Sequence, residues 1–340
     1  MDTNINKPKI TVFIPLYNNE KYIGKTIESI LKQTYQDFEI LIIDDKSTDK
    51  SVEIVMSYND PRIRLMHNDK NEGVVYTRNR GLEETHTDYI AILDSDDISL
   101  PTRLEEQIKF LETHHDFALV GTWTEIIDSM GNKTGVVWKN DISPEMIPMI
   151  LLFQNCFSQS SVMIRMKAVE QNRYRSPDTD EDYDLWIQIS KKWKMWNIPK
   201  ILTQYRTHQT NISKKIFKRP FVENEIKNEL SRLNIDINDE EMVIHKTNYL
   251  YNKPDVKDFI LKREQWLLKL KVANQNVGLF SEKTFTEVIQ ERWLTSCSAN
   301  AYVGFWIWKT FWKSDLSNGT IKTNLPAILK FFIKCLIRKT

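Results

Sequence analysis

The sequence predicts an α/β protein in which a mostly parallel sheet is flanked by helices and followed by a helical C-terminal extension. Short apolar runs alternate with helix-periodic segments through the first half of the chain. Two acidic loops, 44–49 and 94–97, directly follow apolar runs. After about residue 215 the composition shifts to Lys, Asn, Glu and spaced Leu, Ile and Trp, which indicates helices.

The alternation of strands and helices can be placed along the first hundred residues. Helical spacing recurs from Tyr22 to Leu31, and Pro101 stands where the first turn of a later helix would begin. We expect strands at 10–16, 38–43, 62–66 and 89–93, and helices near 22–31, 51–57, 75–85 and 101–111.

The rest of the chain divides into two parts. Strands are expected at 117–123, 161–166 and 198–205, with a helix near 181–192. We therefore place a first domain at residues 1–215 and a mainly helical region at residues 216–340.

Composition excludes several classes of protein. Lys and Arg total 47 against 46 Asp and Glu, a net charge of +1, so there is no electrostatic case for a nucleic-acid partner. Cys156, Cys297 and Cys335 are far apart, which offers no disulfide framework and suits a reducing compartment. The N-terminus lacks the apolar region of a secretory signal, and no segment approaches the roughly 18–20 apolar residues that cross a bilayer. We expect a cytoplasmic protein that could lie on a membrane.

The loop Asp94-Ser95-Asp96-Asp97 is the strongest chemical signal. Carboxylates two residues apart at a strand end can converge on one hard cation, which would stabilise a departing diphosphate. Ligands of open α/β sheets bind beyond the carboxyl ends of the strands, where this loop falls. The structural alternative is a capped helix, with Asp97 or Ser99 as the N-cap before Pro101. The preceding strand and the second acidic loop favour the functional interpretation.

Two further acidic segments invite the same comparison. Asp44-Asp45-Lys46-Ser47-Thr48-Asp49 could accept hydrogen bonds from a nucleoside, or could be an Asx or ST turn. The second segment precedes a helix, where acids also compensate the dipole. Crowded like charges raise a carboxylate's pKa, which favours a general base. Its five acids within seven residues are Asp178, Asp180, Glu181, Asp182 and Asp184.

Five segments together resemble one known family. They read VFIPLYNNEKYIGKTIESILKQTYQDFEILIIDDKSTD, NEGVVYTRNRGL, YIAILDSDDISLPTRLEEQ, EDYDLWIQIS and QYRTHQTNIS. In order and spacing, residues 9–213 resemble the family 2 glycosyltransferases, which have the GT-A fold. Among members, the chain most resembles bacterial enzymes that extend lipooligosaccharide, O-antigen or capsule chains, notably the β-1,3-N-acetylglucosaminyltransferase type.

The resemblance implies a role for each matching residue on the donor side. The nucleobase and ribose would be lined by Pro15, Tyr17 and Glu20, with Asp45 holding the edge of the base. Arg78 would reach the nucleotide. By the same resemblance, residues 1–215 would bind the nucleotide sugar and carry the catalytic residues, and residues 216–340 would serve acceptor or membrane association.

The resemblance also implies the chemistry of transfer. Asp94 would bind the ribose or a metal-bound water, and Asp96 would ligate Mn²⁺ or Mg²⁺ directly. Asp182 would deprotonate the acceptor hydroxyl, and His208 would stand near the diphosphate as a further metal ligand. One position departs from the family's Asp-Asp-Gly-Ser: Lys46 replaces glycine. Because lysine tolerates positive φ poorly, we expect a differently shaped turn there.

The implied reaction is a metal-dependent, inverting transfer from a UDP-sugar, with GlcNAc, Gal, Glc and GalNAc all open, to a glycan acceptor that a lipid could carry. One rival is a nucleotidyltransferase that makes sugar nucleotides, which would want a glycine-rich basic loop where Pro15–Glu20 stands. The other is a non-catalytic sugar-binding module, which would not need metal carboxylates and a base together.

The C-terminal segment 325–339 forms a basic amphipathic pattern. Lys330, Lys334 and Arg338 share one helical face, and no acidic residue follows Pro326. Such a helix could contact the anionic inner face of the cytoplasmic membrane, or could pack its apolar face on the catalytic domain. The apolar residues expected on the opposite side are Leu325, Ile328, Leu329, Phe332 and Leu336.

Overall fold

A computed structural model describes residues 7–175, 181–209, 211, 220–248 and 255–337. The chain forms two compact units. Unit 1 comprises Met1–Ile147 and Asn155–Val222, and unit 2 comprises Pro148–Gln154 and Glu223–Thr340. Residues Asp178 and Asp180 of the acidic segment lie outside the described residues.

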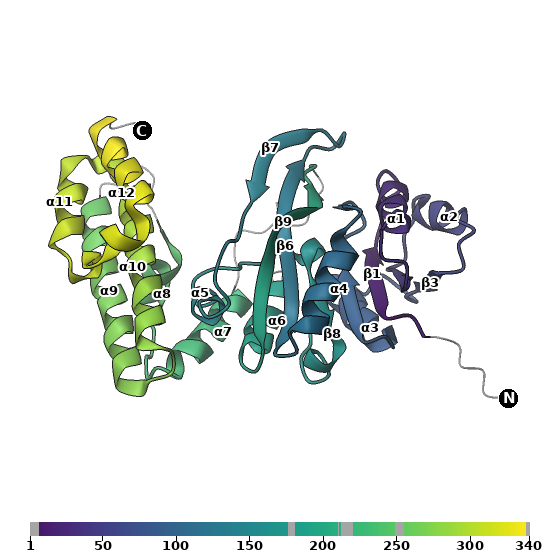
Figure 1. The fold of residues 1–340 in the computed structure, drawn as a ribbon, viewed down its shortest axis with the longest axis horizontal. Coiled ribbons are helices and arrows are strands. Elements are labelled where there is room, and N and C mark those ends of the chain that lie inside the picture. The colour runs from purple at the N-terminus through teal and green to yellow at the C-terminus, as the bar shows by residue number, and fades with distance from the viewer. Residues whose placement is uncertain (1–6, 176–180, 210, 212–219, 249–254, 338–340) are drawn as a thin grey trace. The chain divides into compact units, whose positions relative to one another are not determined.

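Within the described part of unit 1, the strands form one nine-stranded sheet (Figure 1). Its first half consists of parallel strands formed by the apolar runs of the first hundred residues. Their spatial order is β3 (Ile63–His67), β2 (Phe38–Asp44), β1 (Ile10–Leu16) and β4 (Tyr89–Ile92). The mostly parallel α/β class is therefore confirmed.

The second half of the sheet is mixed. The short β8 (Met163–Arg165) is antiparallel to both β4 and β6 (Phe117–Ile127), so β6 runs in the direction of β4. The long β9 (Lys194–Arg206) lies parallel to β6 along its whole length. At the edges, β5 (Ile98–Ser99) pairs with β9, and β7 (Lys133–Trp138) forms a hairpin with β6.

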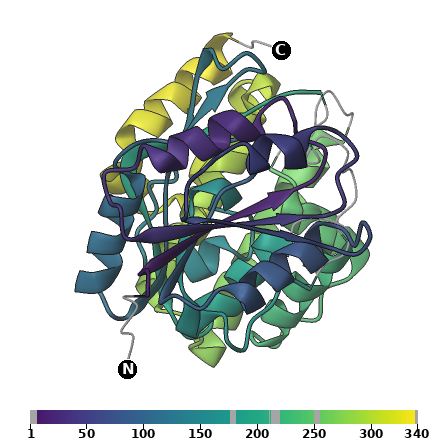
Figure 2. The same ribbon diagram turned by 90° about the vertical axis from the view of Figure 1, so that its right-hand side faces the viewer.

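Helices cover both faces of the parallel half, as Figure 2 shows for α1 (Ile23–Leu31) and α3 (Val74–Glu84). Alternate residues of β1 serve the two faces. Val12 and Ile14 join Ile27 in the main apolar core, whereas the Phe13 ring lies against Gly81 of α3. The remaining helices of this unit are α2 (Ser51–Met56), α4 (Arg103–Thr113) and α6 (Glu181–Ser190), with α5 (Ile147–Ile150) at the unit boundary.

The structural alternative for the loop 94–97, in which Asp97 or Ser99 caps a helix, is wrong. Helix α4 begins after Thr102, which makes no side-chain cap, and Ser99 belongs to strand β5. Asp97 instead accepts a hydrogen bond from the backbone N–H of Arg206, at 2.8 Å. Its carboxylate therefore ties this loop to the end of β9 rather than to a helix.

Unit 2 is helical. Helices α9 (Val256–Val277) and α10 (Glu282–Ala299) pack together through a short connection in which Gly278 adopts a left-handed φ of 69°. The others are α7 (Pro220–Ser231), α8 (Asp239–Lys246), α11 (Phe305–Lys313) and α12 (Thr320–Ile337). Among the described residues, no helix has both the length and the apolar content needed to cross a bilayer.

Candidate active site

Two loops at the carboxyl ends of β1 and β2 are joined by hydrogen bonds. The backbone N–H groups of Asn18 and Asn19 donate to the hydroxyls of Ser47 and Ser51, at 2.9 and 2.7 Å. In return, the Asn18 side-chain oxygen accepts from the backbone of Thr48, at 2.7 Å. The two loops thus form one fixed edge of the sheet.

The residues expected to line a nucleoside lie on this edge. Pro15 is the next-to-last residue of β1 and is partly buried, whereas the Tyr17 ring is 49% exposed. Glu20 is exposed, and its carboxylate accepts from the backbone of Lys50 at 2.9 Å. An exposed aromatic face beside hydrogen-bonded loops can receive a planar base.

Asp45 anchors the neighbouring loop. Its Oδ1 accepts from the Asn68 amide at 2.7 Å and from the backbone of Glu72 at 2.8 Å, and its Oδ2 accepts from the backbone of Gly73 at 2.8 Å. A carboxylate oxygen can accept two hydrogen bonds, so Oδ2 keeps capacity for a ligand N–H. The side chain is buried, which fixes its direction.

The turn after β2 does not avoid positive φ. Lys46 takes a φ of 66°, so the lysine occupies the left-handed region that a glycine would prefer. Replacing glycine by lysine has therefore not removed the left-handed conformation from this turn. The lysine side chain is exposed. The side-chain oxygen Oδ1 of Asp44 accepts a hydrogen bond from the backbone N–H of Ser47 at 3.1 Å, which closes the turn.

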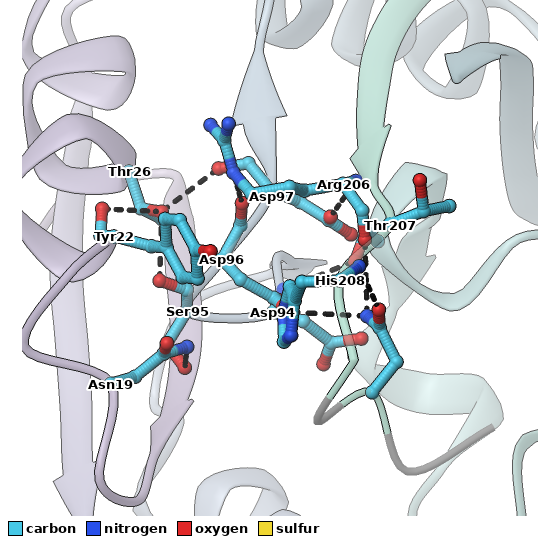
Figure 3. A network of polar contacts seen from close by, with 12 residues as sticks. Asn19, Tyr22, Thr26, Asp94, Ser95, Asp96, Asp97, Arg206, Thr207 and His208 are labelled. Carbon is cyan, nitrogen blue, oxygen red and sulfur yellow. Dashed lines mark hydrogen bonds and ion pairs between the residues drawn. The ribbon is translucent and has the colours of Figure 1, made fainter. Parts of the chain in front are cut away.

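The loop after β4, residues 94–97, is held in place from the side of α1, and its last carboxylate, Asp97, is buried (Figure 3). Thr26 of α1 donates to the carbonyls of Ser95 and Asp97, at 3.0 and 2.9 Å, so the loop backbone is fixed from behind. The Asp97 side chain is fully buried. Burial, with the neighbouring charges of Asp96 and Asp94, raises the pKa of Asp97 well above its ordinary value. Asp97 is a structural member of the loop.

Asp96 and His208 point toward one another across this loop, as Figure 3 shows. The carboxylate Oδ2 and the imidazole Nε2 are 2.7 Å apart. The His208 ring stacks on Tyr22 of the β1–α1 segment at 5.0 Å, and the Arg206 guanidinium lies over the same Tyr22 ring at 4.9 Å. These contacts set the direction of the imidazole.

The Asp96–His208 pair fits a divalent ion. Neighbouring ligands around an octahedral ion with bonds of about 2.1 Å lie about 3 Å apart, close to the separation of these two atoms. In the described part of the chain, no three His, Cys, Asp or Glu side chains group closely enough to hold an ion. The protein would thus supply one or two ligands, and phosphate oxygens and water the others, as in many Mg²⁺ sites.

Arg78 of α3 links two acidic segments. Its guanidinium donates to Asp94 at 3.0 Å and also to Glu181 at the start of α6. Burial would lower the pKa of Arg78, but the carboxylates of Glu181 and Asp94 outweigh it and raise that pKa. The Arg78 side chain is only 7% exposed. The residue expected to reach the nucleotide thus lies between the two acidic segments.

The acids that begin α6 have separate partners. Glu181 pairs with Arg78, and the buried Asp184 forms an ion pair with Arg175 through two hydrogen bonds. Asp182 lies between them and is partly exposed, and its Oδ2 accepts from the Asn155 amide at 3.1 Å. Each of its two neighbours thus has an arginine partner, and the Asn155 amide is one of the groups that contact Asp182.

For several residues of this site the sequence indicated no role. Tyr22 and Arg206 flank His208, and Asn155 holds Asp182. Ser160 accepts from the backbone of Asp94 at 3.1 Å. Tyr22, Asn155 and Ser160 contact residues far away in the chain, so sequence spacing could not reveal these contacts.

Comparison with known proteins identifies a family for this chain. The family model described as glycosyl transferase family 2 matches residues 11–173. An uncharacterized glycosyltransferase of Haemophilus influenzae is 31% identical over 249 residues, which cover 73% of this chain and 95% of that protein. The UDP-Glc:alpha-D-GlcNAc-diphosphoundecaprenol beta-1,3-glucosyltransferase WfgD of Escherichia coli is 33% identical, over 62% of this chain and 81% of WfgD.

A solved structure shares the fold. The crystal structure of S. aureus TarS 1-349 in complex with UDP-GlcNAc superposes with a TM-score of 0.57 at 18% identity, and covers 97% of this chain and 90% of that one. The chain spans 50% of the longer TarS chain. With relatives above 30% identity along most of their length, the chain belongs to glycosyltransferase family 2.

Proposed function

We propose that the protein is an inverting glycosyltransferase that moves a sugar from a UDP-sugar to a glycan acceptor. The observation that carries this proposal is the buried Arg78, which ties Asp94 on the donor side to Glu181, the neighbour of Asp182. Donor-binding and proton-accepting groups would then share one fixed framework. Such preorganisation is what a single-displacement reaction requires.

The donor side is proposed from the edge formed by the loops after β1 and β2. The exposed Tyr17 ring would contact the base with Pro15 and Glu20, and the free capacity of Asp45 Oδ2 would accept an N–H of the base edge. Two similar proteins support UDP: TarS was crystallised in complex with UDP-GlcNAc, and WfgD is named as a glucosyltransferase with UDP-Glc as donor.

We propose that Asp96 and His208 hold Mn²⁺ or Mg²⁺, with Asp94 beside them. When bound, the ion would neutralise charge on the departing diphosphate. The protein's own contribution is to hold the carboxylate and the imidazole facing one another through Arg206, Tyr22 and the buried Asp97.

Asp182 is proposed as the base. Its carboxylate would take the proton of the acceptor hydroxyl while that oxygen forms a bond to the anomeric carbon and the bond from that carbon to the diphosphate oxygen breaks. Attack from the side opposite the leaving group inverts the configuration. The Asn155 amide would keep the carboxylate turned toward the acceptor.

The acceptor is proposed to be a glycan carried by a lipid, in the synthesis of bacterial surface polysaccharide or lipooligosaccharide. WfgD, whose name specifies a diphosphoundecaprenol-linked GlcNAc acceptor, supports this class. The same proposal assigns the catalytic domain to residues 1–215. Residues 216–340 would serve the acceptor and contact the inner face of the cytoplasmic membrane.

The decisive experiment is a donor screen that measures the nucleotide released. UDP-Glc, UDP-GlcNAc, UDP-Gal and UDP-GalNAc are each incubated with lipid-linked acceptors, with Mn²⁺ or with EDTA. Acceptor-dependent UDP release supports transfer, whereas pyrophosphate release would indicate a nucleotidyltransferase and binding without turnover a sugar-binding module. Asp96→Ala should abolish turnover and metal-dependent UDP binding, with the exposed Asp69→Ala as control. Full activity in EDTA would refute the metal proposal.

A further inference from the structure

Helix α12 has two apolar faces, one covered and one exposed. Ile328, Phe331 and Cys335 are buried, with exposures of 4%, 0% and 1%. Their face packs on α10 and α11, with the Phe331 ring against Trp308 and Phe311. Between residues 325 and 337 the other apolar face is half exposed, at 51–54% for each member: Leu325, Leu329, Ile333, Leu336 and Ile337.

The apolar side expected opposite the lysines contains residues of both faces: Ile328 is buried, whereas Leu325, Leu329 and Leu336 are exposed. At about 100° per residue, the exposed apolar residues span an arc of about 120° that adjoins the buried arc. The exposed Lys330 and Lys334 continue from its far edge. The order around the helix is therefore a buried apolar face, an exposed apolar face and then a cationic edge. One apolar face of α12 is buried in the protein, and a second apolar face is still exposed.

Aromatic side chains border the exposed face on the side away from the lysines. The Phe332 ring lies 4.9 Å from Trp308 and 6.2 Å from Phe305. Phe305, at the start of α11, is itself 45% exposed. Trp and Phe beside an apolar helical face are typical of segments that lie at a membrane interface.

The charge around this face has one sign. Residues 305–340 contain seven Lys and Arg and one acidic residue, Asp315, which gives a net charge of +6. The chain as a whole carries only +1, so the positive charge is concentrated at this end. A second copy of the protein would bring the same cations together, whereas an anionic surface would attract them.

We propose that α12, with Phe305 of α11, docks on an anionic phospholipid bilayer. The face defined by Leu325, Leu329, Ile333, Leu336 and Ile337 would enter the boundary between headgroups and acyl chains, and Lys330 and Lys334 would contact phosphate groups. The inference rests on the proposed function because a lipid-carried acceptor would have to be reached at such a surface.

Vesicle flotation of the full-length protein, without donor or acceptor, tests the apolar part. Wild type should float with vesicles of equal parts phosphatidylcholine and phosphatidylglycerol, and far less with phosphatidylcholine alone. Leu329→Glu with Ile333→Glu should reduce the bound fraction at least about tenfold. The matched control is Leu261→Glu with Val272→Glu, two side chains of α9 with 46% and 51% exposure, and should float like wild type.

Two lysine substitutions test the charge part. Lys330→Gln with Lys334→Gln should weaken binding to the anionic vesicles about fivefold per lysine, whereas Lys271→Gln with Lys283→Gln should not. Wild type that fails to float, or an α12 variant that floats like wild type, overturns the proposal. So does light scattering that shows a dimer which only the α12 variant dissociates, since the face would then bind a second copy. UDP release, measured in parallel, separates failure of this proposal from failure of the proposed function.

Discussion

At the residue scale, the site depends on how its charges are divided between partners. Three acids begin α6, and two of them are balanced by Arg78 and Arg175. Asp182 is held by the neutral Asn155 amide. A base was expected in this segment because its carboxylates are crowded. Arg78 and Arg175 offset the negative charge of Glu181 and Asp184 and so reduce that crowding. Asp182, the proposed base, is partly exposed, and the Asn155 amide holds its carboxylate.

Replacement of Asp182 by Asn keeps the shape and removes basicity. We expect the rate of transfer to fall by about 10²–10⁴-fold, while the affinity for UDP changes little. The measurement is single-turnover transfer together with UDP binding by calorimetry. A variant that loses UDP binding and keeps its rate would show that another carboxylate is the base.

Replacement of Arg78 by Lys keeps the positive charge and removes the fork that bridges Asp94 and Glu181. Because Asp94 would lose a fixed partner beside the proposed ion, we expect metal-dependent UDP binding or turnover to weaken by about 10–100-fold. A Mn²⁺ titration of UDP binding measures this. Arg80→Lys is the matched control, since Arg80 lies on the same helix and donates to His67 and Asn68 instead. Equal Mn²⁺ dependence in both variants would refute the bridging role.

At the element scale, sequence patterns located the parallel half of the sheet. Strand β1 was predicted at its observed bounds, and β2, β3 and β4 within a residue, because each is an apolar run next to loop residues. Strand β7 was missed since five of its six residues are exposed, which leaves no apolar pattern. The segment predicted as a strand at 161–166 is shorter, because Gln159–Ser161 form a 3₁₀ turn.

The site was predictable only in part, because sequence patterns reveal local features and not contacts between distant residues. Acidic loops at strand ends are local signals, and every residue named in advance lies in an acidic segment or in a segment that resembles the family. Arg78 and Glu181 are 103 positions apart, and Asp96 and His208 are 112 apart. The order of the strands in the sheet determines which cation contacts which carboxylate, and residue spacing does not predict that order.

Contact between α3 and β1 gives a test of the fold. A methyl group at Gly81 would lie 2.4 Å from the buried Phe13 ring, so Gly81→Ala should destabilise the protein by about 1–3 kcal/mol. Gly24→Ala, in α1, meets its nearest atom at 3.3 Å and gains helix propensity, so it should cost much less. Denaturant unfolding compares the two variants. Equal stabilities would mean that the ring moves aside freely.

At the scale of the whole molecule, the two compact units differ in how they should respond to acid. Unit 2 contains His245, whose Nε2 donates to the Leu152 carbonyl at 2.6 Å and whose Nδ1 accepts from the Trp266 indole at 3.0 Å. Both nitrogens are therefore used by the neutral ring. Burial, assisted by the charges of Arg263 and Arg292, lowers the pKa of His245 to about 3.

The sign of the pH dependence follows from this pKa. An unfolded chain protonates His245 below about pH 6.5, whereas the folded protein resists protonation until about pH 3, so the unfolded state binds more protons between these values. Stability contributed by unit 2 should thus fall as pH falls, by about 1.4 kcal/mol per pH unit within this window. Above pH 6.5 this histidine adds no pH dependence.

Hydrogen exchange at pH 7 and pH 5, corrected for intrinsic rates, can follow α8 and α9 separately from β1 and β2. We expect protection of the helices to drop by about 2 kcal/mol at pH 5 in wild type, with β1 and β2 less affected. His245→Gln should weaken unit 2 at pH 7 but remove most of this pH dependence, because glutamine does not titrate. The exposed His86→Gln is the control and should behave like wild type. If His245→Gln kept the full pH dependence, other groups would be responsible, and the buried histidine would have no part in the acid sensitivity of unit 2.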